Sequence, residues 1–130
     1  MDTDLRTIPL FDGLPDQDLA RIADWLEPIE VPAGWYLLNQ GPSPVGFFVV
    51  VSGQCTVERE GAAIATLGPG DFFGEIALLE GEHRTATVIT ATSVKALVMD
   101  SDEFFEMCAE IPEVGQRINA AALERSGPSN

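Results

Sequence analysis

The sequence is poor in basic residues. It has seven lysines and arginines against 21 aspartates and glutamates, which gives a formal net charge of −14 at pH 7. A protein this acidic repels the phosphate backbone of nucleic acids and anionic membrane surfaces, and its few basic residues are scattered along the chain without forming a patch. We therefore expect no nucleic-acid partner.

Histidine and cysteine are also scarce. The chain has one histidine, His83, and two cysteines, Cys55 and Cys108. Metal enzymes built on small β-rolls hold their metal through several histidines and a carboxylate, and Ser-His or Cys-His hydrolases need a nucleophile beside a histidine. One histidine in a predicted loop meets neither requirement, so we expect no metal and no enzymatic activity. The two cysteines fit no metal or redox spacing, and we interpret them as buried, reduced thiols of a cytoplasmic protein.

Long hydrophobic runs are missing as well. The longest apolar run, residues 45–51, is far shorter than the roughly 20 residues of a membrane-spanning helix. The acidic start at residues 1–4 lacks the basic and apolar regions of a signal peptide, so we expect neither membrane insertion nor secretion. With 130 residues, 45% of them apolar, the chain can bury one core. We expect a single domain over residues 1–125 and a frayed tail over residues 126–130.

The apolar pattern that is present predicts a helix followed by strands. From Pro15 onward, apolar residues recur at helical spacing, and Pro28 ends the pattern. Short extended runs follow, separated mostly by glycine and proline at intervals of about 8 to 12 residues, which is typical of an antiparallel β-roll of the jelly-roll type. The predicted strands are 29–31, 35–38, 47–51, 54–59, 63–67, 85–90 and 94–99.

The C-terminal part returns to helical spacing. Asp100 with Glu103 three residues later is typical of a capping box that begins a helix. We expect the apolar side of this helix, including Phe104 and Phe105, to pack in the core. A second helix is predicted from Pro112 to about Arg125. Its apolar stripe consists of Val114, Ile118, Ala121 and Ala122.

Between the predicted strands, one segment has the composition of a cradle for a cyclic phosphate on a ribose. Gly74 removes a Cβ where the backbone must approach a ligand closely. Glu75, Ile76 and Ala77 follow as the first turn of a short predicted helix, whose free N–H groups point at an anion. A carboxylate only accepts hydrogen bonds, so Glu75 suits a sugar hydroxyl and not a phosphate oxygen.

The same segment ends with the opposite charge. The planar guanidinium of Arg84 can hold two phosphate oxygens at once, and the Thr85 hydroxyl and the Ala86 amide add neutral donors on the same side. Without ligand, Arg84 can also pair with a nearby carboxylate. Taken singly, each of these residues is more often an ordinary solvated surface residue, and only the whole set at this spacing predicts a binding site.

This set resembles the phosphate-binding cassette of the cyclic nucleotide-binding domain family. The resemblance lies in Gly74-Glu75-Ile76-Ala77-Leu78 with Arg84-Thr85-Ala86-Thr87-Val88, where the glutamate and the arginine are nine positions apart, and turn and strand signatures extend it over nearly the whole chain. It implies a β-roll with an N-terminal helix, a short cassette helix and two C-terminal helices. It also implies that the last helix acts as a lid over the base, and packing in the core is the alternative for its apolar stripe. The implied ligand is a cyclic nucleotide, for which we favour cAMP, with cGMP as the alternative.

The chain departs from the family pattern at two places. His83 stands where the family often has proline, which predicts a less rigid loop, and Pro44-Val45-Gly46 replaces a Gly-Asp turn. Relatives that bind DNA carry a helix-turn-helix after the lid helix, about where this sequence ends, which again favours no DNA binding. We therefore expect a stand-alone cyclic nucleotide sensor that acts through a protein partner or fused effector. The alternatives are a β-roll interaction module without nucleotide and the regulatory domain of a longer protein.

Overall fold

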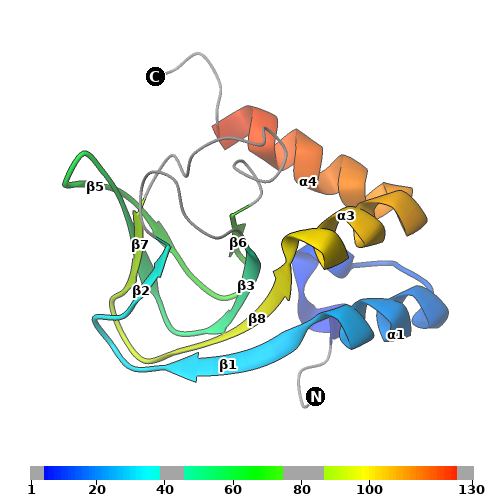
Figure 1. The fold of residues 1–130 in the computed structure, drawn as a ribbon, viewed down its shortest axis with the longest axis horizontal. Coiled ribbons are helices and arrows are strands. Elements are labelled where there is room, and N and C mark those ends of the chain that lie inside the picture. Colours follow the sequence, from blue (N-terminus) through cyan, green and yellow to red (C-terminus); the bar gives the residue numbers. More distant parts are fainter. Residues whose placement is uncertain (1–4, 39–45, 75–86, 126–130) are drawn as a thin grey trace.

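The computed structural model describes residues 5–38, 46–74 and 87–125 of the chain. Its helices gather on one side and its strands on the other (Figure 1). The helical elements are two short 3-10 helices, η1 (Leu5–Thr7) and η2 (Pro9–Phe11), and the α-helices α1 (Asp16–Trp25), α3 (Ser101–Glu110) and α4 (Pro112–Arg125). The strands are β1 (Glu27–Val31), β2 (Tyr36–Leu38), β3 (Gly46–Ser52), β4 (Cys55–Arg59), β5 (Ala62–Leu67), β6 (Phe72–Phe73), β7 (Thr87–Thr90) and β8 (Val94–Asp100).

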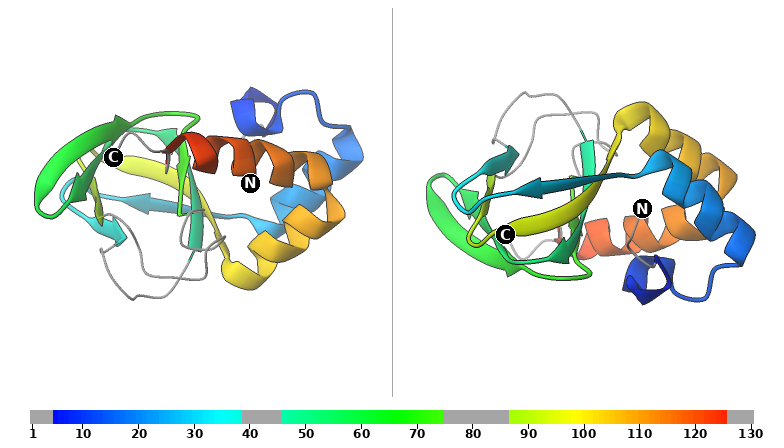
Figure 2. Two further views of the ribbon diagram at one scale, coloured as in Figure 1. Left: turned by 90° about the horizontal axis from the view of Figure 1, so that it is seen from above. Right: turned by 90° about the horizontal axis from the view of Figure 1, so that it is seen from below.

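The strands form two four-stranded antiparallel sheets that face each other. Sheet A has the order β1-β8-β3-β6, and sheet B has the order β2-β7-β4-β5. The helices cover the face of sheet A that points away from sheet B, as the views from above and below show (Figure 2). This confirms the predicted antiparallel β-roll with flanking helices, whereas the predicted cassette helix lies outside the described residues.

Sheet A separates two hydrophobic clusters because its side chains alternate between its faces. On β3, Phe47 and Val49 are fully buried against the helices, whereas Val50 points into the interior between the sheets. We call the space between the two sheets the roll interior. Its buried hydrophobic residues are Val50, Cys55, Phe73, Val88, Val94 and Ala96.

The helix ends follow from local chemistry. The Asp100 carboxylate accepts from the Glu103 amide at 2.8 Å, and the Glu103 carboxylate accepts from the Asp100 amide at 3.1 Å, so the predicted capping box is confirmed. Helix α1 ends at Trp25, and Pro28 lies within β1 instead of marking the helix end. Proline is tolerated there because β1 is an edge strand. Among the described residues, no helix is both long and apolar enough to cross a bilayer.

One core prediction is wrong. Phe104 is fully buried, but Phe105 is 48% exposed. The rings of Phe104 and Phe105 pack edge to face with a centroid distance of 5.5 Å. Successive residues on a helix point about 100° apart, so a narrow contact with a sheet buries one of the two and leaves the other toward solvent. From the sequence alone, both phenylalanines fitted the apolar stripe of this helix equally well.

Candidate functional site

Seven residues are predicted to bind the ligand, and the structure describes one of them, Gly74. The others lie in residues 75–86, outside the described residues: Glu75, Ile76, Ala77, Arg84, Thr85 and Ala86. His83 lies in the same segment. The structure does place both ends, because Gly74 directly follows β6 of sheet A and Thr87 begins β7 of sheet B. The chain between these ends therefore passes from one sheet to the other.

Strand β6, which leads into this segment, is held from both faces although it has only two residues. The Phe73 ring stacks on Phe48 with a centroid distance of 4.8 Å and an interplanar angle of 6°. The Phe72 ring packs on Phe47, on the helical side, at 5.6 Å. Backbone pairing joins the same strand to β3. These contacts hold the start of the predicted binding segment firmly on sheet A.

The turn before β6 is closed by hydrogen bonds. The Asp71 carboxylate accepts from the Gly68 amide at 2.8 Å, and the Asp71 amide donates to the Gly68 carbonyl at 3.0 Å. The Gly70 amide donates to the Val50 carbonyl, and the Val50 amide donates to the Asp71 carbonyl, each at 2.8 Å. Gly70 has a φ of +91°, and a Cβ there would lie 3.1 Å from Pro9 Cδ. Glycine is therefore required at this position both by the backbone and by the contact with η2.

Gly74 itself has a φ of +99°, a conformation that other residues rarely adopt. The sequence predicted glycine at this position for close approach to a ligand. The structure shows an additional reason, since the chain leaves β6 through this backbone conformation. A side chain at Gly74 would therefore introduce strain of about 1 to 3 kcal/mol even without ligand.

The strand that follows the segment, β7, is anchored through a buried threonine. Val88 is 2% exposed and pairs with Val57 on β4. Thr90 is also 2% exposed, and its hydroxyl accepts from the Trp35 amide at 2.8 Å and donates to the Pro32 carbonyl at 2.6 Å. The hydroxyl thus acts once as acceptor and once as donor, which ties the turn before β2 to β7. Sequence reasoning placed Thr90 only as a strand residue and missed this role.

The roll interior between the two anchors contains a hydrophobic cluster. Burial raises the pKa of the Cys55 thiol, so this thiol stays protonated at neutral pH and is a poor nucleophile. Burial also raises the pKa of Cys108, which is half-buried on α3, and both cysteines are free. Within residues 5–38, 46–74 and 87–125, no group of three metal-ligating side chains occurs. The buried hydrophobic residues of the interior thus offer an anion only apolar contact.

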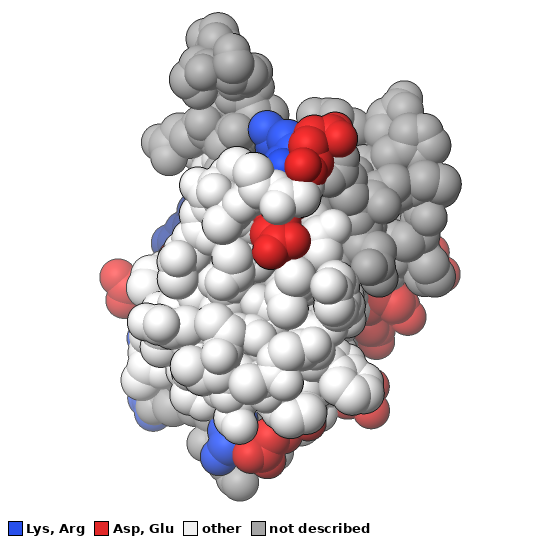
Figure 3. Space-filling view, turned by 90° about the vertical axis from the view of Figure 1, so that its left-hand side faces the viewer, with Lys and Arg blue, Asp and Glu red and all other residues white. Residues whose placement is uncertain are grey.

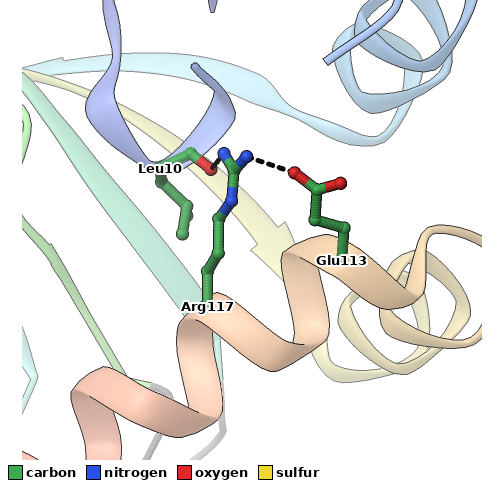
Figure 4. A network of polar contacts seen from close by, with 3 residues as sticks. All are labelled: Leu10, Glu113 and Arg117. Atoms are coloured by element: carbon green, nitrogen blue, oxygen red, sulfur yellow. Dashed lines mark hydrogen bonds and ion pairs between the residues drawn. The ribbon is translucent and has the colours of Figure 1, made fainter. Parts of the chain in front are cut away.

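Two arginines outside the segment are engaged on the helical side of the molecule. Arg21 pairs with Glu110 and lies over the Trp25 ring at 5.6 Å. Arg117 donates to the Leu10 carbonyl at 2.8 Å and pairs with Glu113 one turn earlier on α4 (Figure 4). The sequence spacing indicates the Glu113 pair, but the bond to Leu10, 107 positions away, has no sequence signal.

Helix α4 is packed into the hydrophobic core through its first half. Val114 and Ile118 are fully buried in the cluster between sheet A and the helices. A Cβ on Gly115 would lie 3.3 Å from Cys108 Cβ, so this glycine allows α3 and α4 to approach closely. From this packed start, α4 extends back toward the β-roll in each of the three views (Figures 1 and 2).

Comparisons with known proteins agree with this geometry. A model of the family described as cyclic nucleotide-binding domain matches residues 28–111, which include both anchors and the segment between them. The chain is 39% identical to a cyclic nucleotide-gated potassium channel of Mesorhizobium japonicum over 92% of the chain and 33% of the channel. It is 35% identical to a cGMP-dependent protein kinase of Caenorhabditis briggsae over 96% of the chain and 18% of the kinase.

Among solved structures, the catabolite activator protein of Thermus thermophilus is similar in fold. The TM-score is 0.81 at 25% identity, and the match covers 90% of this chain and 57% of that protein. The chain spans about a third or less of the length of the channel and the kinase. What these longer proteins do as wholes therefore rests partly on segments that this chain does not match.

Proposed function

Because the chain belongs to the cyclic nucleotide-binding domain family, we propose that it senses cAMP and passes its state to a protein partner or a fused effector. The observation that carries the proposal is the family match over residues 28–111, with a Glu75-to-Arg84 interval between two anchored strands. We propose no catalytic step in this chain. The signal then depends on a change in the population of conformations that the effector can distinguish.

In this proposal, each residue of the segment has one role. Arg84 binds the exocyclic phosphate oxygens, and Glu75 accepts from the ribose 2′-hydroxyl. The Thr85 hydroxyl and the Ala86 amide donate to the phosphate. The backbone at Gly74, Ile76 and Ala77 lines the cradle, with the amides of the last two directed at the anion. The hydrophobic cluster of the roll interior contains no charged residue, so in this proposal Arg84 neutralises the phosphate.

Isothermal titration calorimetry of the purified chain with cAMP tests the proposal directly. We expect saturable binding of one nucleotide per chain, and no comparable heat with 5′-AMP, which lacks the cyclic phosphate. Absence of binding by both cAMP and cGMP would instead support the interaction module without nucleotide.

The choice between cAMP and cGMP depends on Thr85. Adenine has no amino group at C2, whereas guanine has one that must find an acceptor when it leaves water. The Thr85 hydroxyl can serve as that acceptor for a syn purine while it also contacts the phosphate. We therefore expect Thr85→Ala to weaken cGMP binding more than cAMP binding, with Thr87→Ala as the control. Competition titrations measure both affinities. A strong wild-type preference for cGMP would contradict cAMP as the ligand.

Helix α4 is the element that we propose responds to nucleotide. Its first half is fixed by Val114 and Ile118 in the core and by Arg117 on Leu10, so we expect the response in its later turns, which extend toward the roll. Hydrogen exchange with saturating cAMP should show added protection in residues 70–86 and in the second half of residues 112–125. Protection confined to residues 70–86 would show that α4 is not a lid and that the domain is a passive binder.

A further inference from the structure

Strand β5 is an exposed edge strand. It is the last strand of sheet B and, among the described strands, pairs only with β4. Every residue from Ala62 to Thr66 is exposed, and Ile64 is 51% exposed. The unpaired side of such a strand presents backbone N–H and C=O groups that can pair with another strand.

The other three sheet edges are protected in ways that β5 is not. Strand β1 carries Glu27, Pro28 and Glu30, and charges and proline both discourage pairing. Strands β6 and β2 have only two and three residues. Strand β5 has six residues, AAIATL, without charge or proline. A bulge opposite Val57 and Glu58 bends it, which is its one protective feature.

Charge makes this edge unusual for the molecule. The chain carries a net charge of −14, so two copies repel each other over most orientations. No charged residue occurs from Gly61 to Gly70, and the strands of sheet B contain only Glu58 and Arg59 as charged residues. Figure 3 looks onto the side of the molecule where sheet B lies, and most of the described surface in this view belongs to residues other than Lys, Arg, Asp and Glu. Here two copies can meet without opposing many carboxylates.

The uncharged surface continues from β5 across sheet B. Tyr36, Ile89, Thr56 and Thr66 are register partners in one row across all four strands. Their neighbours along the strands point into the roll interior, so this row faces outward. Tyr36 is 56% exposed. A copy joined at the β5 edge would extend this surface without adding charge.

We propose that the β5 edge is a self-association site, at which β5 of one copy pairs antiparallel with β5 of a second copy. A two-fold axis brings the same strand from both copies together, and antiparallel pairing is compatible with that symmetry. With the axis between Ile64 and Ala65, six uncharged residues of each strand face each other. The contact is small, so the dimer is weak, with a dissociation constant of about 10 µM to 1 mM.

Sedimentation velocity over about 10 to 500 µM protein tests the proposal. We expect the sedimentation coefficient to rise with concentration. Raising the salt from about 0.1 to 1 M shortens the Debye length from about 10 to about 3 Å, so salt should strengthen the association of these acidic chains. A chain that stays monomeric throughout this range would overturn the proposal.

Matched variants locate the contact. Ala63→Glu places a carboxylate on the exposed β5 edge, and Ala109→Glu places one on exposed α3, so both change the net charge equally. We expect Ala63→Glu to raise the dissociation constant at least about tenfold and Ala109→Glu less than about threefold. A mixture of Ala63→Glu and Ala63→Lys should associate more strongly than Ala63→Glu alone, which a misfolded variant would not do. Equal effects of Ala63→Glu and Ala109→Glu would place the contact elsewhere.

Discussion

Arg84→Ala should weaken cAMP binding by about 2 to 5 kcal/mol, or about 1.5 to 3.5 decades in the dissociation constant. The variant leaves the phosphate partly desolvated without its proposed cationic partner. Two other arginines, Arg21 and Arg117, are paired with carboxylates on the helical side. Calorimetry of the wild type and the variant measures the loss.

Arg21→Ala is the matched control for this experiment. It removes the same charge from the ion pair of Arg21 with Glu110, in which both side chains are about 40% exposed. We therefore expect it to change cAMP affinity little. Equal binding by the wild type and Arg84→Ala would refute the assigned role of the arginine.

A second test concerns the sugar. Glu75→Ala should weaken cAMP binding but change 2′-deoxy-cAMP binding little, because that ligand lacks the hydroxyl that Glu75 is proposed to accept from.

Phe104→Ala should lower the free energy of unfolding by about 3 to 5 kcal/mol. Phe104 is fully buried, and its ring lies 5.1 Å from Phe47, which in turn contacts Phe72 at 5.6 Å. The truncation leaves a cavity where α3 meets sheet A, next to the strand that leads into the binding segment. The loss is a large part of the total stability of a small domain, about 5 to 15 kcal/mol. Urea denaturation followed by circular dichroism measures it.

Phe105→Ala is the matched control for Phe104→Ala. The two residues are adjacent on the same helix, but Phe105 is 48% exposed. We expect its truncation to cost less than about 1.5 kcal/mol, mainly through the edge contact with Phe104. Similar losses for the two variants would contradict the burial that the structure assigns to them.

The elements of the fold and the family of the chain could be predicted from the sequence, because both depend on local patterns. Glycine and proline divide the apolar runs at strand length, and the capping box at Asp100 needs only residues three positions apart. The Glu75-to-Arg84 interval is likewise local, and it identified the family that the comparisons show. The ligand contacts of these residues remain proposals. Strand β6 was not predicted, since two residues are too few to show the alternation of apolar and polar residues that is typical of a strand.

Tertiary structure decided everything that depends on a distant partner. Phe104 and Phe105 fit the same apolar stripe, and only contact with Phe47 shows which one is buried. The bond from Arg117 to the Leu10 carbonyl joins residues 107 positions apart. The exposed edge of β5 likewise follows from strand order and not from its composition. The sequence by itself determined the order of the elements and the residues at the proposed site, because hydrophobic period and turn chemistry act over a few residues. Which face each element buries depends on its neighbours in space.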